Sequence, residues 1–92
     1  AFVAGRKLEF ARYRDARRGK PGPIPVGHPY VLQNTGEFCA GYLEMFLRNP
    51  NGFAAMNPLL FEGYVLLLRW DPRGVWLEDF GLYLAQNRKA YQ

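Results

Sequence analysis

Four prolines lie within nine residues of this chain, from Pro21 to Pro29. Proline fixes φ at about −65° and has no backbone N–H, so such a stretch forms neither a helix nor an inner strand of a sheet. We therefore expect residues 21–29 to be an extended linker that spaces two elements across a surface. The linker divides the chain into an N-terminal segment, residues 1–20, and a body, residues 30–92.

The N-terminal segment holds most of the basic charge. It has seven cations against two acids, a net charge of +5, whereas the remaining residues have five cations against six acids, a net charge of −1. An excess of this kind predicts an anionic partner. We take the seven cations and two tyrosines as candidate partner-binding residues: Arg6, Lys7, Arg12, Tyr13, Arg14, Arg17, Arg18, Lys20 and Tyr30.

Residues 1–18 are compatible with two structures. As a strand, Leu8 and Phe10 alternate with charged residues, but Arg12 continues the apolar face. As a helix, the apolar residues fall on opposite sides, so no single apolar face results. Ala, Leu, Arg and Lys dominate and no proline interrupts the segment, which favours the helix.

A second helix is predicted from Asn34 to Arg48. Asn34 can cap its start, and Asn49-Pro50-Asn51-Gly52 ends it. Glu44 and Arg48 form an i,i+4 pair in the favourable orientation. Apolar side chains follow one another at helical spacing, namely Phe38, Cys39, Tyr42, Met45 and Phe46. The pattern predicts that this face of the helix is core.

The C-terminal third has the pattern of a β-hairpin. Residues 63–70 are apolar on both faces, as a covered strand would be. Residues 75–80 alternate, and Asp71-Pro72-Arg73-Gly74 between them has the residues that a type I turn prefers. The competing interpretation makes both segments helices hinged at Pro72, because the run Leu66–Leu68 is also typical of a helix.

These elements predict a single small α+β domain, with a basic helix at the N-terminus, one central helix and a C-terminal hairpin. The alternative is an all-α domain. We expect residues 53–62 to be a connector with one helical turn, and residues 82–92 to be a short helix or a fraying end. A chain of 92 residues buries only about 60–65% of its unfolded surface, so its stability is modest.

The chain has no run approaching the roughly 18 apolar residues of a membrane helix, so we expect a soluble or peripheral protein without a transmembrane segment. A single cysteine, Cys39, cannot form an intramolecular disulfide, which favours a reducing intracellular compartment or an organelle interior. Arg-rich N-termini are also typical of transit peptides that are removed on import, but we expect residues 1–20 to belong to the mature protein.

No familiar catalytic signature is present. The single histidine, His28, lies in the linker, where no orienting partner follows from the sequence. With one His and one Cys, a metal site would need carboxylates, and these are scattered, so we expect no metal and no cofactor. Cys39 is the most plausible reactive side chain, but its place on the apolar stripe favours a buried, inert thiol.

The sequence therefore favours a non-enzymatic accessory subunit of a larger protein assembly, which docks through its basic segment and exposed aromatic residues. This hypothesis assumes that segment and linker bury little by themselves and are ordered by a partner. The alternative is a nucleic-acid-binding protein, either a ribonucleoprotein subunit or a single-strand binder, that uses the Arg/Lys cluster. A second alternative is a small enzyme with a reactive thiol at Cys39.

Overall fold

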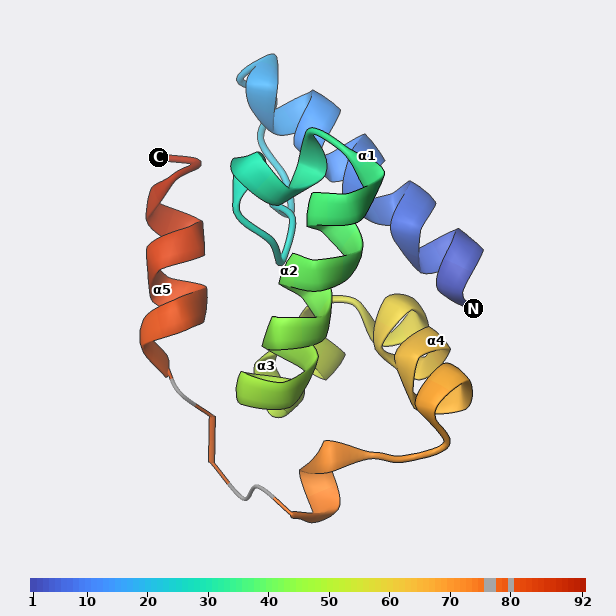
Figure 1. Cartoon of the computed structure of the whole chain (residues 1–92). Helices are drawn as coiled ribbons and strands as arrows, with labels where there is room; N and C mark the ends of the chain where they lie inside the picture. Colours follow the sequence, from blue (N-terminus) through green and yellow to red (C-terminus); the bar gives the residue numbers. More distant parts are fainter. Residues whose placement is uncertain (76–77, 80) are drawn as a thin grey trace.

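The protein is an all-helical domain. The structure is a computed structural model that describes residues 1–75, 78–79 and 81–92, and these contain helices and no strand (Figure 1). The α-helices are α1 (Phe2–Arg17), α2 (Thr35–Arg48), α3 (Pro50–Met56), α4 (Pro58–Leu68) and α5 (Gly81–Lys89), and the short 3₁₀ helices are η1 (Pro29–Leu32) and η2 (Pro72–Gly74). The α+β prediction is therefore wrong, and the all-α alternative is confirmed.

The predicted hairpin is replaced by a helix and a turn. Residues 63–68 belong to α4, which ends at Arg69 in the left-handed conformation, with φ 54°. An apolar run does not distinguish a covered strand from a buried helix. Here the leucines and the proline at the first helical position favour the helix. The predicted turn is the 3₁₀ helix η2, in which Asp71 accepts a hydrogen bond from the backbone N–H of Arg73. The predicted second strand, residues 75–80, lies partly outside the described residues.

Helix α2 matches its prediction. The side chain of Asn34 accepts a 2.8 Å hydrogen bond from the backbone N–H of Glu37 and so caps the helix. Arg48 pairs with Glu44 at 3.3 Å. Four of the five stripe residues are buried, Phe38, Tyr42, Met45 and Phe46. They meet Phe53, Leu60, Phe61 and Tyr64 of α3 and α4 in the core.

Each of the two Asn-Pro pairs starts a helix. Pro50 opens α3 and Pro58 opens α4, so the prediction for residues 53–62 is wrong. Proline at the first helical position has the required φ, and its missing N–H would have no partner in the helix. The side chain of Asn57 accepts from the backbone N–H of Leu60 and caps α4.

Helices α1 and α4 are packed antiparallel at close range, because each has a glycine at the contact. A Cβ on Gly5 would overlap the backbone N and Cα of Leu60, and a Cβ on Gly63 would overlap the backbone of Phe2. Glycine permits this approach of one backbone to another. The helix predicted for residues 1–18 is thus confirmed, and α4 packs against its N-terminal half, where Phe2 meets Gly63 and Gly5 meets Leu60.

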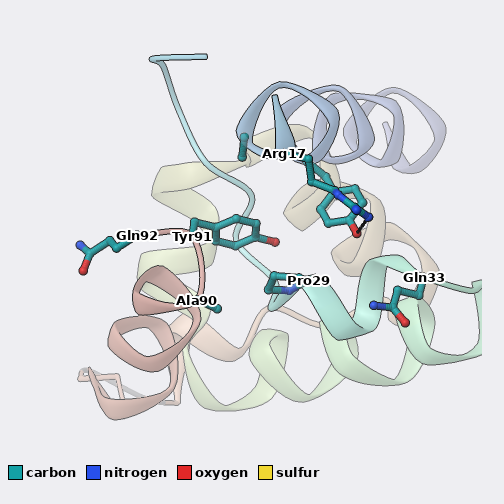
Figure 2. A pocket seen from close by; sticks show the side chains of 8 residues that line it. Arg17, Pro29, Gln33, Ala90, Tyr91 and Gln92 are labelled. Carbon is teal, nitrogen blue, oxygen red and sulfur yellow. Dashed lines mark hydrogen bonds between the residues drawn. The ribbon is translucent and has the colours of Figure 1, made fainter. Parts of the chain in front are cut away.

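The linker and α5 complete the domain. Pro25, Val26 and Gly27 are buried beneath neighbouring elements. The side-chain amide of Asn87 in α5 donates to the backbone carbonyl of Val26, and the Tyr91 hydroxyl donates a 2.6 Å hydrogen bond to the carbonyl of Gly27. The end of the chain therefore lies beside η1 and the C-terminal half of α1 (Figure 2).

Candidate functional site

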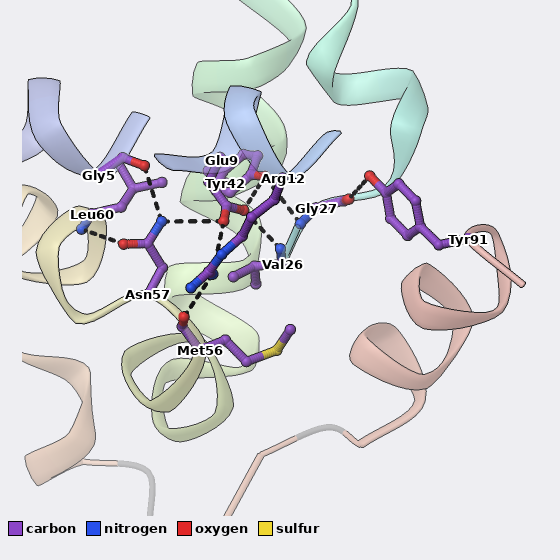
Figure 3. Close-up of polar contacts among 10 residues, drawn as sticks. All are labelled: Gly5, Glu9, Arg12, Val26, Gly27, Tyr42, Met56, Asn57, Leu60 and Tyr91. Carbon is purple, nitrogen blue, oxygen red and sulfur yellow. Dashed lines mark hydrogen bonds and ion pairs between the residues drawn. The ribbon is translucent and has the colours of Figure 1, made fainter. Parts of the chain in front are cut away.

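A buried carboxylate fixes α1 to the rest of the domain (Figure 3). Glu9 is fully buried, and its carboxylate accepts hydrogen bonds from three other segments. The donors are the backbone N–H of Val26 at 2.7 Å, the hydroxyl of Tyr42 at 2.5 Å and the amide of Asn57 at 3.2 Å. Since an ionised carboxylate is costly to bury without partners, this network determines which face of α1 points inward.

Arg12 belongs to the same network. Its guanidinium lies 3.4 Å from the Glu9 carboxylate and donates a 2.8 Å hydrogen bond to the backbone carbonyl of Met56. Only 17% of its side chain is exposed. Arg12 was among the candidate partner-binding residues, but its guanidinium is engaged inside the fold.

Burial keeps the Tyr42 hydroxyl protonated. Removal from water raises the pKa of Tyr42 far above its ordinary value of 10.0, and the neighbouring Glu9 carboxylate raises it further. The hydroxyl therefore remains a donor to Glu9, while it accepts a 3.0 Å hydrogen bond from the backbone N–H of Gly27. Helix α1, the linker and α2 are joined at one point.

The face of α1 opposite this network is basic. The inward positions Phe2, Gly5, Glu9 and Arg12 follow one another every three or four residues and form one helical stripe. At about 100° per residue, the residues directly opposite are Lys7, Arg14 and Arg18, and all three are exposed. We call these three residues the basic stripe.

The remaining cations of the segment have different surroundings. Arg17 and Lys20 are exposed near the end of α1. Arg6 is half-buried, and its guanidinium lies over the rings of Phe10 and Phe38, at 4.8 and 5.6 Å from the ring centres. Arg6 therefore covers the core more than it faces outward.

The two candidate tyrosines are separated. Tyr30 lies on η1 and is 58% exposed. Tyr13 is half-buried, and its hydroxyl accepts a 3.1 Å hydrogen bond from Arg17, whose guanidinium also lies 5.7 Å from the centre of the Tyr13 ring. Tyr13 and Arg17 thus form a pair on the side of α1 between its inward stripe and the basic stripe.

A pocket of about 410 Å³ opens beside this pair (Figure 2). Helix α1 contributes one wall, the η1 region a second and the end of the chain a third. Its lining residues are Tyr13, Ala16, Arg17, Pro29, Gln33, Ala90, Tyr91 and Gln92. We call this space the tyrosine pocket. No Asp or Glu side chain is among these lining residues.

The sequence interpretation missed Gln33, Tyr91 and Arg88. Arg88 lies with Arg12, Pro23 and Ile24 around a second pocket next to the linker. The cluster Arg88-Lys89 close to Tyr91 combines cations with an aromatic residue and was a visible signal. Only the fold shows that this C-terminal cluster lies close to residues 13–17, because the two segments are far apart along the chain.

Other chemistry is sparse in the described residues. Cys39 is exposed, so the prediction of a buried thiol is wrong, because this position lies at the edge of the apolar stripe of α2. His28 caps η1 through Nδ1, which accepts from the backbone N–H of Tyr30 at 3.1 Å.

No group of three His, Cys, Asp or Glu that could hold a metal occurs in the part of the chain that the structure describes. Across those same residues, no helix is both long and apolar enough to cross a bilayer.

Comparison with protein-family models, with curated proteins and with solved structures finds no match for this chain.

Proposed function

We propose that this domain binds nucleic acid through the basic stripe of α1 and the exposed cations beside it. The observation that supports this proposal best is the position of Lys7, Arg14 and Arg18. They project from the side of α1 opposite to its buried anchor, so the fold presents them to solvent. From residue 7 to residue 18 the helix rises about 16 Å, which matches roughly five phosphate steps of one duplex strand.

The local charge favours an anion. Arg14 has a neighbouring carboxylate, Asp15, at 3.5 Å, but both side chains are exposed and such a pair is weak. For Lys7, Arg18 and Lys20 there is no ion-pair partner among the described residues. Phosphates can therefore be bound without breaking a strong internal contact.

The hypothesis of an accessory subunit has less support. It assumed that the segment and linker need a partner in order to be ordered. Within the chain itself, however, Glu9 and Gly5 of α1 and Val26 of the linker are buried. The basic residues are thus presented by a folded domain, which fixes their positions for contact with phosphates.

The test is the salt dependence of binding to oligonucleotides. Affinity for a labelled strand of about 20 nucleotides, measured by fluorescence anisotropy between about 50 and 200 mM salt, should fall with a log–log slope of about −3.5 if five exposed cations contact phosphates. The triple variant Lys7→Gln, Arg14→Gln, Arg18→Gln should lower the magnitude of the slope by about 2.

A matched control removes the same charge elsewhere. Arg48→Gln, Arg69→Gln and Arg73→Gln together alter three cations on α2, at the end of α4 and on η2. This control should leave the slope close to that of the parent chain. If both triple variants lowered the magnitude of the slope equally, only net charge would matter for binding, and the proposal would be contradicted.

A second candidate function, docking on a larger protein assembly, is favoured by one observation. Leu66 and Leu67 of α4 are 63% and 70% exposed and line an apolar pocket with Phe2 and Gly63. An exposed apolar cluster of this kind is typical of a surface that contacts protein. If this function holds, the chain should sediment in a large particle that survives nuclease, and Leu66→Ser with Leu67→Ser should release it.

A further inference from the structure

We infer that the tyrosine pocket holds an unpaired nucleobase, so that the domain prefers single-stranded nucleic acid to duplex. This inference rests on the proposed function and adds to it a site for the base. The walls of the pocket come from α1, from the η1 region and from the end of the chain.

The first wall is lined by Tyr13 and Arg17. The guanidinium lies 5.7 Å from the centre of the Tyr13 ring and donates to its hydroxyl at 3.1 Å. Both groups are planar, and bases that have left the duplex stack on aromatic rings and on guanidinium planes. The hydrogen bond holds the two groups together at the mouth of the pocket.

The opposite wall contains Tyr91, whose position is fixed. Its hydroxyl donates a 2.6 Å hydrogen bond to the carbonyl of the buried Gly27, so the ring has one end anchored in the fold. Burial raises the pKa of Tyr91 above its ordinary value of 10.0, and the hydroxyl remains a donor at neutral pH. The ring lies beside Pro29 (Figure 2), and together these residues give this wall an apolar lining.

The polar groups of the pocket suit a base and its phosphates. The exposed amide of Gln33 offers both a donor and an acceptor to the edge of a base. Phosphates on either side of that base would meet the exposed Arg14, Arg18 and Lys20. A paired base cannot reach such a pocket, because both its faces are stacked within the duplex.

The probes are a labelled oligo(dT), an oligo(U) and a duplex, each of about 20 nucleotides or base pairs, at one salt concentration. The parent chain should bind the single strands at least about tenfold more tightly than the duplex. The two single strands distinguish DNA from RNA as the source of the base. Tyr13→Leu keeps an apolar side chain but removes the ring, and it should weaken single-strand binding by about 5- to 150-fold while duplex binding is unchanged.

Tyr30 was a candidate partner-binding residue, but it is exposed on η1 and does not line the pocket. Tyr30→Leu is therefore the control and should leave all three affinities unchanged. Tyr13→Phe restores the ring and should recover most of the affinity that Tyr13→Leu loses. If the chain binds neither single strands nor duplex, the proposed function fails. If it binds both equally, and Tyr13→Leu changes neither, the proposed function stands and the base pocket is wrong.

A second measurement does not depend on the folding of a variant. Irradiation of the parent chain with an oligonucleotide that carries 5-iodouracil should attach the base to Tyr13 or Tyr91, as located by mass spectrometry of peptides. Attachment confined to other residues would overturn the inference.

Discussion

The carboxylate of Glu9 accepts a 2.5 Å hydrogen bond from the hydroxyl of Tyr42, which lies 33 residues further along the chain. Both side chains are fully buried, and the bond joins the basic helix α1 to the central helix α2. The same carboxylate pairs with Arg12, so one buried acid positions the helix that carries the candidate binding surface. Removal of the Glu9 carboxylate should therefore lower the stability of the domain before it weakens binding.

Replacing Glu9 with Gln should destabilise the domain by about 3 kcal/mol, because it leaves Arg12 without its ionic partner in a largely buried site. Urea unfolding followed by circular dichroism measures the change. Glu62→Gln alters an exposed acid of α4 and should stay within about 0.5 kcal/mol of the parent. If Glu9→Gln and Glu62→Gln had equal effects, the network would not stabilise the fold as described.

Gly5→Ala should destabilise the domain by about 1–3 kcal/mol, because its Cβ would overlap the backbone of Leu60 and force α1 away from α4. In a helix without such a contact, this change would stabilise by up to about 1 kcal/mol. The control is Gly74→Ala, where an added Cβ meets nothing within 4 Å. A thermal melt of both variants would contradict the close contact if Gly5→Ala melted at or above the parent temperature.

The domain should lose stability as the pH rises above about 10. Burial raises the pKa of Tyr42, Tyr64 and Tyr91 above the ordinary value of 10.0, so the unfolded chain releases these protons at a lower pH than the native one. Their contribution is complete below pH 10 and is lost above it. Urea midpoints from about pH 8 to pH 11 should therefore fall, and less steeply in Tyr42→Phe. Parallel curves for the two chains would rule out this role of Tyr42.

Cys39 should react with iodoacetamide in the native chain at a rate within a few-fold of that in denaturant, because the residue is exposed. Cys39→Ser should change the free energy of unfolding by less than about 0.5 kcal/mol. Mass spectrometry of the alkylated chain follows the reaction. Protection that disappears only on unfolding would show that the thiol is covered.

Helix α2 could be predicted from sequence because its signals are local. The cap of Asn34, the apolar spacing of Phe38 to Phe46 and the stop at Asn49-Pro50 act within a few residues of one another. Helix α1 was harder to predict, because its inward stripe consists of Phe2, Gly5, Glu9 and Arg12. A search for apolar residues does not detect a glycine contact or a buried ion pair.

The C-terminal prediction failed for a related reason. Residues 63–68 are apolar on every side, and such a run has no period that distinguishes a strand from a helix. Gly63 lets α4 lie against Phe2, a contact between residues 61 positions apart in the sequence, which no local pattern reveals.

By itself, the sequence determined the linker, the excess of cations in residues 1–20 and the helix α2, because proline geometry, charge and helix caps act over short distances. The tertiary structure decided which cations face solvent and which are engaged inside. It also placed Tyr13 and Arg17 in one pocket with Tyr91. The physical reason is that the burial of Glu9 fixes the rotation of α1, and its hydrogen-bond donors come from three segments that only the folded chain brings together.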